Sequence, residues 1–155
     1  MQFKGPAQNQ EMTDDVSALQ FSGLDTALEI EWTEVGGDRA VVTWTVGEQH
    51  LQPFGIVHGG AYCAVNESAA SIAGQVWLGT RAMVVGVNNN TDFLRQAGLG
   101  ERLTTVATPI HRGRQSQLWV METTNEQGKL LARGQVRLAH IEGELPAEFA
   151  ARFGL

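Results

Sequence analysis

Cysteine and long apolar runs are scarce in this sequence. Cys63 is the only cysteine among 155 residues, so no intramolecular disulfide can form, and a reducing compartment is the expected environment. Gly, Asn, Glu and Ser interrupt the apolar stretches, and the first 22 residues contain no apolar run that would suit a signal peptide. These absences predict a cytoplasmic protein that neither crosses nor binds a membrane.

Basic residues are also few. The net charge is −6, which argues against a nucleic-acid partner. Up to Glu48 there are two basic and nine acidic residues, whereas from Gln49 to Met121 there are five basic and three acidic residues. The middle of the chain therefore suits a small anionic ligand, unless its arginines simply lie on strand surfaces. The four histidines lack metal-ligand spacing, so no metal site is expected.

The length and the 43% hydrophobic content fit one globular domain. Residues 1–22 are a polar lead-in that we expect to be loosely ordered, and residues 23–141 form the predicted domain. The tail comprises residues 142–155, in which Pro146 to Phe153 could form a short helix.

Alternating apolar and polar residues predict strands. Ala27–Val35 and Ala40–Val46 flank a Gly-rich turn and predict a hairpin. Further on, alternation predicts four long strands in a meander, at Met83–Leu94, Arg102–His111, Ser116–Thr124 and Leu130–His140. Between these two groups, Ala61–Leu78 is apolar on most sides and predicts a buried helix. The expected class is α+β, with a curved antiparallel sheet around one long central helix.

The helix is preceded by His58-Gly59-Gly60. Amides of a first helical turn have no partner within the helix, and glycines leave them uncovered. Together with the helix dipole, they suit a carbonyl that becomes an oxyanion. The same three residues could also be no more than the start of a helix.

Glu67 is a carboxylate in the middle of this apolar helix, and Ser71 follows one turn later. Burying a carboxylate is costly, so Glu67 requires either a structural partner or a chemical purpose. Eight residues separate it from Gly59, which is a rise of roughly 12 Å. Glu67 can therefore act on a carbonyl held by Gly59 only if the two belong to different subunits, with two antiparallel helices across a dimer axis.

Gln52, Phe54-Gly55, His58-Gly59-Gly60, Glu67 and Ser71 occur in the order and spacing of a known family. The chain resembles the hotdog-fold thioesterases of the phenylacetate-pathway (PaaI-like) type, nearest to the 4-hydroxybenzoyl-CoA and 1,4-dihydroxy-2-naphthoyl-CoA thioesterases. The resemblance implies a hydrolase that converts an aromatic or medium-chain acyl-CoA to the free acid and CoA. It also implies homodimers that pair into tetramers, and no cofactor apart from the CoA of the substrate.

The resemblance also implies roles. The Gly59 amide would polarise the thioester carbonyl, with Gln52 and His58 orienting the substrate. Glu67 of the other subunit would be nucleophile or general base, and Ser71 would position water. Substrate-binding residues would be Gly60, Asn90, Arg95, Arg112, Gly113 and Arg114. The chain departs from some members of the family at Asp92-Phe93, where those members have Asn-His.

Two other functions fit the same pattern. One is a non-catalytic acyl-CoA sensor, although residues 1–22 are too short and acidic for the DNA-binding module it would need. The other is a hydratase or dehydratase on the same fold. The acyl group and the choice between an anhydride and a general-base route stay open. Tyr62, Val65 and Trp77 either line an acyl pocket or belong to the core.

Overall fold

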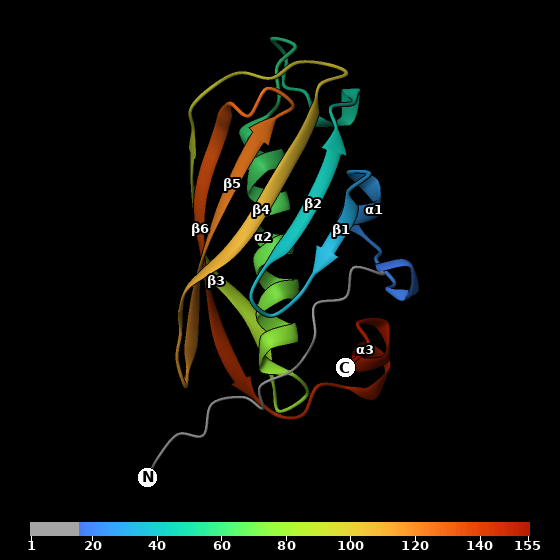
Figure 1. The fold of residues 1–155 in the computed structure, drawn as a ribbon, viewed down its shortest axis with the longest axis vertical. Helices are drawn as coiled ribbons and strands as arrows, with labels where there is room; N and C mark the ends of the chain where they lie inside the picture. Colours follow the sequence, from blue (N-terminus) through green and yellow to red (C-terminus); the bar gives the residue numbers. More distant parts are fainter. Residues whose placement is uncertain (1–15) are drawn as a thin grey trace.

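The structure is a computed structural model that describes residues 16–155. Most of the predicted lead-in, residues 1–15, lies outside the described residues. The elements are η1 (Val16–Ala18), α1 (Leu24–Ala27), β1 (Glu31–Val35), β2 (Ala40–Thr45), η2 (Glu48–His50), α2 (Gly59–Leu78), β3 (Ala82–Phe93), β4 (Arg102–Arg112), β5 (Ser116–Asn125), β6 (Leu130–Glu142) and α3 (Ala147–Arg152). Figure 1 shows α2 running along one face of the curved sheet.

The sheet is antiparallel and has the strand order β1-β2-β4-β5-β6-β3. The predicted hairpin and the curved sheet around a single long helix are confirmed. The predicted four-strand meander is wrong in one connection, because β3 pairs with β6 and not with β4. The 20-residue helix α2 spans about 30 Å and carries the chain from β2 to the opposite edge of the sheet, so β4 can pair with β2.

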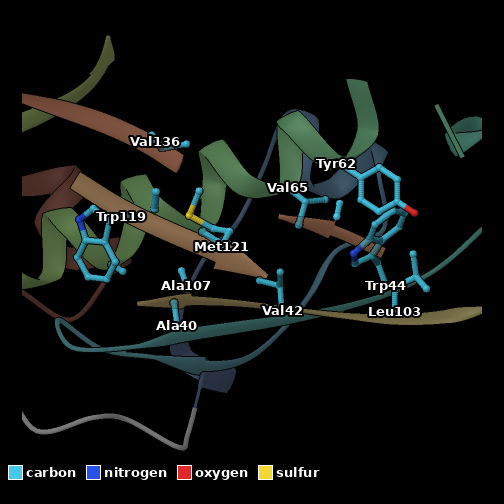
Figure 2. Close-up of a cluster of buried hydrophobic side chains, with 14 of the residues drawn as sticks. Ala40, Val42, Trp44, Tyr62, Val65, Leu103, Ala107, Trp119, Met121 and Val136 are labelled. Atoms are coloured by element: carbon cyan, nitrogen blue, oxygen red, sulfur yellow. The ribbon is translucent and has the colours of Figure 1, made fainter. Parts of the chain in front are cut away.

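The helix α2 is buried because its side chains are small where it faces the sheet. Ala61, Val65, Ala69 and Ala73 recur every fourth residue and are all buried. In Figure 2 larger side chains, among them Trp44 and Trp119, lie against the same helix. The sequence left open whether Tyr62 and Val65 line an acyl pocket or belong to the core. Both are part of the buried core.

The periphery differs from the prediction at one place. The expected strand Ala27–Val35 begins only at Glu31, since residues 24–27 form the helical turn α1 and Glu29 has a positive φ of 50°. Asp25 of α1 accepts a hydrogen bond from the Ser68 hydroxyl at 2.5 Å, which ties the turn to α2. The predicted C-terminal helix is present as α3, slightly shorter than Pro146 to Phe153.

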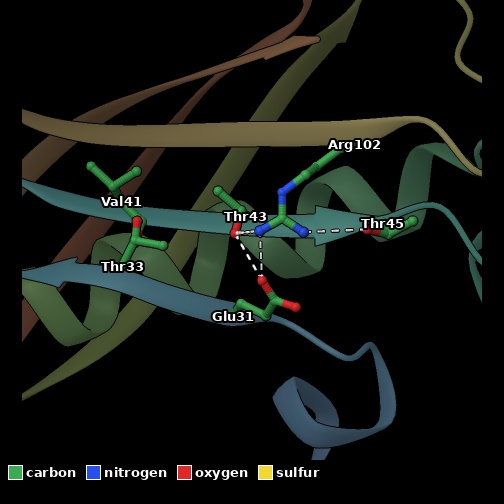
Figure 3. A network of polar contacts seen from close by, with 6 residues as sticks. All are labelled: Glu31, Thr33, Val41, Thr43, Thr45 and Arg102. Atoms are coloured by element: carbon green, nitrogen blue, oxygen red, sulfur yellow. Dashed lines mark hydrogen bonds and ion pairs between the residues drawn. The ribbon is translucent and has the colours of Figure 1, made fainter. Parts of the chain in front are cut away.

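Arg102 illustrates why a basic residue in the middle of the chain need not bind a ligand. Its Nη2 donates to Glu31 Oε2 at 2.6 Å and to Thr43 Oγ1 at 2.9 Å, so it joins β4 to β2 and β1 (Figure 3). The hydrogen bond from Arg102, together with its positive charge, lowers the pKa of Glu31. This arginine therefore belongs to a strand surface.

Candidate active site

The start of α2 is shaped by His58, which is the N-cap residue. Its Nδ1 accepts a hydrogen bond from the Gly60 amide at 2.8 Å, and the Ala61 amide donates to the His58 carbonyl at 2.9 Å. Within the described residues, the Gly59 amide has no such acceptor. Because Nδ1 accepts, the proton of a neutral His58 is on Nε2. The helix start therefore offers the Gly59 amide as a hydrogen-bond donor to a ligand.

The loop that leads into α2 is held by backbone hydrogen bonds. The amide of Gln52 donates to the carbonyl of Ile56, and that of Val57 to Ala97, both at 2.9 Å. The Gln52 side chain accepts from the Phe54 amide at 2.6 Å through Oε1. Its NH₂ group is thus the part of the side chain left to donate to a ligand, and it lies in the same loop as His58.

Phe93, at the end of β3, covers Gly59. A Cβ at position 59 would come within 2.6 Å of the tip of the Phe93 ring, so a larger residue there would have to displace that ring. The Phe93 side chain is nevertheless exposed, at 55%, and its ring lies 6.0 Å from that of Tyr62. Burial, with the Glu101 carboxylate as the second cause, raises the pKa of Tyr62 to about 12. Tyr62 therefore keeps its phenolic proton at physiological pH, and its buried ring lies behind that of Phe93.

Glu67 is half-buried and projects from α2 toward β3. Its Oε2 accepts a hydrogen bond from Asn89 Nδ2 at 3.0 Å. No Lys, Arg or His among residues 16–155 forms an ion pair with it. The other carboxylate oxygen, Oε1, lies against the backbone of Gly86, where a Cβ would overlap it and would approach Cδ to 2.8 Å. Glu67 is therefore not a salt-bridged structural carboxylate.

A bulge in β3 decides which of its residues face α2. The register with β6 shifts between Gly86 and Asn88. Gly86 pairs with the buried Leu138, and after the shift Asn89, Thr91 and Phe93 pair with Val136, Gly134 and Ala132, which are also buried. The additional residue thus directs Asn89 toward the helix, where a regular strand would have turned it outward.

Three further predicted residues, Ser71, Gly60 and Asn90, lie on α2 and β3. Ser71 is half-buried one turn after Glu67, and makes no hydrogen bond to Glu67 or to any other described side chain. Gly60 is exposed in the first turn of α2. Asn90 is exposed and pairs with Gln135, at an outward position between Asn89 and Thr91. Glu67 and Gly59 are both on α2, about 12 Å apart along its axis, so one chain does not bring them together.

The arginines that the resemblance assigned to CoA differ in how they are engaged. Arg112 Nη1 donates to the Gly37 carbonyl at 2.6 Å and to Asp38 at 2.7 Å, and its guanidinium lies over the Trp77 ring. Arg95 is exposed and donates to the Leu130 carbonyl at 2.6 Å.

Arg114 is exposed and lines a cavity of about 530 Å³ together with Gly113, Trp77, Arg81 and His140. The cavity lies at the end of α2 remote from Gly59, and four ionisable side chains border it: Arg81, Arg114, His140 and Glu142. An anion would meet the two arginines there, beside the carboxylate of Glu142.

Sequence reasoning gave no role in the site to three residues: Gly86, Asn89 and Phe93. A glycine within a strand pattern signals close approach of another group, so Gly86 could have been assigned to the site. Asn89 stands in a run of three asparagines, a residue type depleted in strands, but nothing in the sequence indicates which of the three faces the helix.

Two further observations concern metal ions and membranes. Among residues 16–155 no group of three or more His, Cys, Asp or Glu side chains is arranged to hold a metal ion. In the same part of the chain, no helix has the length and apolar character needed to cross a membrane.

Comparison with known proteins bears on the family to which the chain belongs. The Thioesterase superfamily profile matches residues 54–132. The 1,4-dihydroxy-2-naphthoyl-CoA hydrolase of Escherichia coli is 34% identical over 112 residues, which is 72% of this chain and 82% of that protein. The crystal structure of S. sahachiroi AziG has a TM-score of 0.77 and 46% identity, covering 80% of this chain and all of that one.

The E. coli PaaI protein of the phenylacetic acid degradation operon has a TM-score of 0.72 and 29% identity, over 79% of this chain and 87% of that one. The matched residues include the helix start, Glu67 and β3. The fold, the motif and these relatives agree that the chain belongs to the thioesterase superfamily of hotdog-fold enzymes, as a member of its PaaI-like group and a thioester hydrolase.

Proposed function

We propose that this protein hydrolyses an aromatic or medium-chain acyl-CoA to the free acid and CoA, without a cofactor other than the CoA of the substrate. Two groups on α2 carry the proposal: the Gly59 amide, which has no described acceptor, and the Glu67 carboxylate, which forms no ion pair with any cation among residues 16–155. The first group stabilises negative charge on oxygen, and the second supplies a nucleophile or base.

In this mechanism the Gly59 amide donates to the thioester carbonyl, aided by the dipole of α2. Gln52 and His58 orient the substrate through the NH₂ group of the amide and through Nε2–H. Glu67 either attacks the carbonyl carbon, expelling CoA thiolate and leaving an anhydride that water opens, or removes a proton from an attacking water positioned by Ser71. Single turnover in ¹⁸O-labelled water separates the routes, because label enters Glu67 only in the first.

The acyl group is proposed from the surroundings of Gly59. The exposed ring of Phe93 lies directly against Gly59 and offers an apolar, aromatic face beside the bound carbonyl. The Escherichia coli relative is named for hydrolysis of an aromatic acyl-CoA. The exposed arginines Arg95 and Arg114 are the candidates for contacts with the CoA phosphates.

We expect the purified protein to release CoA from benzoyl-, phenylacetyl- or medium-chain acyl-CoA, with a kcat on the order of 1 to 10 s⁻¹ on its preferred substrate. A thiol reagent measures the released CoA, and the Glu67→Gln variant is the matched control. Absence of turnover across the panel would contradict the proposed function.

The site is proposed to be completed by a second copy of the chain. β3 is an edge strand that pairs with β6 on one side and with no described strand on the other. Val85 and Val87 on it are 42% and 57% exposed, and an exposed apolar edge favours pairing with another strand. Antiparallel pairing of two β3 strands about a two-fold axis would set the two α2 helices side by side, with Glu67 of one near Gly59 of the other.

Val87→Lys should therefore shift the protein from dimers, or tetramers built from them, toward monomers, because two like charges would meet across the axis. Light scattering after gel filtration measures the mass, and hydrolysis should decline with the dimer fraction. Ile110→Lys is the matched control, since Ile110 is 50% exposed but lies on β4. An unchanged mass for Val87→Lys would exclude β3 as the interface.

A further inference from the structure

We infer that Asn89 is a positioning residue for Glu67, and that Thr91 and Asn66 fix the orientation of its amide. The inference rests on the proposed function and adds to it a set of residues outside the sequence motif. Asn89 Nδ2 donates to Glu67 Oε2 at 3.0 Å and to the Cys63 carbonyl, one helical turn earlier, at 2.9 Å. One amide thus holds both the carboxylate and the helix that carries it.

The hydrogen bonds behind Asn89 have a defined direction. Asn66 Nδ2 donates to Thr91 Oγ1 at 3.0 Å, and the Thr91 hydroxyl is 3.0 Å from Asn89 Oδ1. A hydroxyl has one proton, so Thr91, accepting from Asn66, donates that proton to Asn89. Asn89 Oδ1 is thereby held on the side of Thr91, and Nδ2 faces Glu67. With the amide reversed, its oxygen would face two acceptors, the Glu67 carboxylate and the Cys63 carbonyl.

The polar side chains between β3 and α2 fit because two nearby positions, Gly134 and Gly86, have no side chain. A Cβ at Gly134 would come within 2.6 Å of both Asn66 Nδ2 and Thr91 Oγ1, and a Cβ at Gly86 would overlap Glu67 Oε1. The bulge after Gly86 turns Asn89 and Thr91 to the helix face of β3. Two glycines and one additional residue therefore accommodate three polar side chains between β3 and α2.

The network is not arranged for stability alone. Asn66 is 1% exposed, and its Oδ1 is buried without a hydrogen-bond partner among the described residues. An unsatisfied buried acceptor destabilises the folded state. Such an unfavourable polar group beside Glu67 is consistent with a role in the reaction, because proteins tolerate destabilising local features mainly at functional sites. The hydrogen bond to Oε2 restrains the carboxylate, and Oε1, which accepts no hydrogen bond from residues 16–155, is the oxygen that would attack or accept a proton.

The test compares Asn89→Ala, Thr91→Val and Thr91→Ser in the full-length protein, with kcat and KM measured on the best acyl-CoA of the panel. We expect Asn89→Ala to lower kcat by on the order of 10- to 100-fold, with KM within about twofold, because a misplaced group slows chemistry more than binding. Thr91→Val keeps the shape and removes the hydroxyl, so we expect a loss of about fivefold, which Thr91→Ser should largely restore. Thermal melting checks that each variant is folded.

A second arm asks whether the effect passes through Glu67. Glu67→Asp withdraws the carboxylate from Asn89 by about one bond length, so adding Asn89→Ala to it should cost little further rate if the two residues act together. A loss that persists undiminished in that background, a change confined to KM, or unchanged kcat in both Asn89→Ala and Thr91→Val would overturn the positioning role while the proposed function stands. If the unaltered protein hydrolyses no substrate, the proposed function fails, and the positioning role fails with it.

Discussion

Replacing Glu67 with Ala should lower kcat by roughly 10³-fold or more, because the reaction loses its nucleophile or base. The folded state should remain, since Glu67 is only half-buried and forms no ion pair among residues 16–155. Stopped-flow and long-time thiol-release assays together cover the expected range of rates, and circular dichroism follows the fold.

Glu67→Gln sharpens the interpretation of that result. The amide keeps the volume of the side chain and an oxygen that can accept from Asn89 Nδ2, so the network of β3 is preserved. A similarly large loss in this variant would assign the effect to the carboxylate charge. Activity near that of the unaltered protein in either variant would remove Glu67 from the site.

Gly86→Ala should cause the second large loss, although Gly86 contacts no substrate in the proposed mechanism. A methyl group there overlaps Glu67 Oε1, and the cheapest relief is rotation of the flexible carboxylate away from its position beside Asn89. We expect kcat to drop by on the order of 100-fold, with a change in unfolding free energy below about 1 kcal/mol.

The matched control for this substitution is Gly98→Ala. The added methyl group at Gly98 would lie 3.9 Å from its nearest neighbour, which is an ordinary contact. Its kcat should therefore stay close to that of the unaltered protein. If Gly86→Ala were as active as Gly98→Ala, the observed position of Glu67 would not be the one used in the reaction.

Much of the fold could be predicted because its signals are local. The helix from Ala61 to Leu78 and the strands that follow it show their periodicity within a dozen residues each, and their positions are confirmed within a few residues. The place of β3 could not be predicted in the same way. Periodicity states that a strand exists but not which strand it pairs with, and here a long helix separates β3 from its predecessor in the chain.

In the candidate site, too, the residues that are close in sequence could be predicted and those brought together by folding could not. Gln52, His58, Gly59, Glu67 and Ser71 lie within twenty residues, so their spacing is visible as a motif, and their roles stay predictions. Asn89 meets Glu67 across 22 positions of sequence, through a pairing and a bulge that exist only in the folded sheet. The resemblance assigns Arg112 to substrate binding, and that role stays a prediction; in the structure its guanidinium contacts Asp38, Gly37 and Trp77.

The bulge in β3 also affects how related sequences should be aligned. Before it, even-numbered residues such as Val84 and Gly86 face the helix; after it, odd-numbered residues do. In a relative whose β3 lacked the additional residue, alternate residues would face the helix without interruption along the whole strand. An ungapped alignment would then equate an inward residue of one protein with an outward residue of the other, and substitutions at Asn89 would be compared at positions that face opposite sides of the sheet.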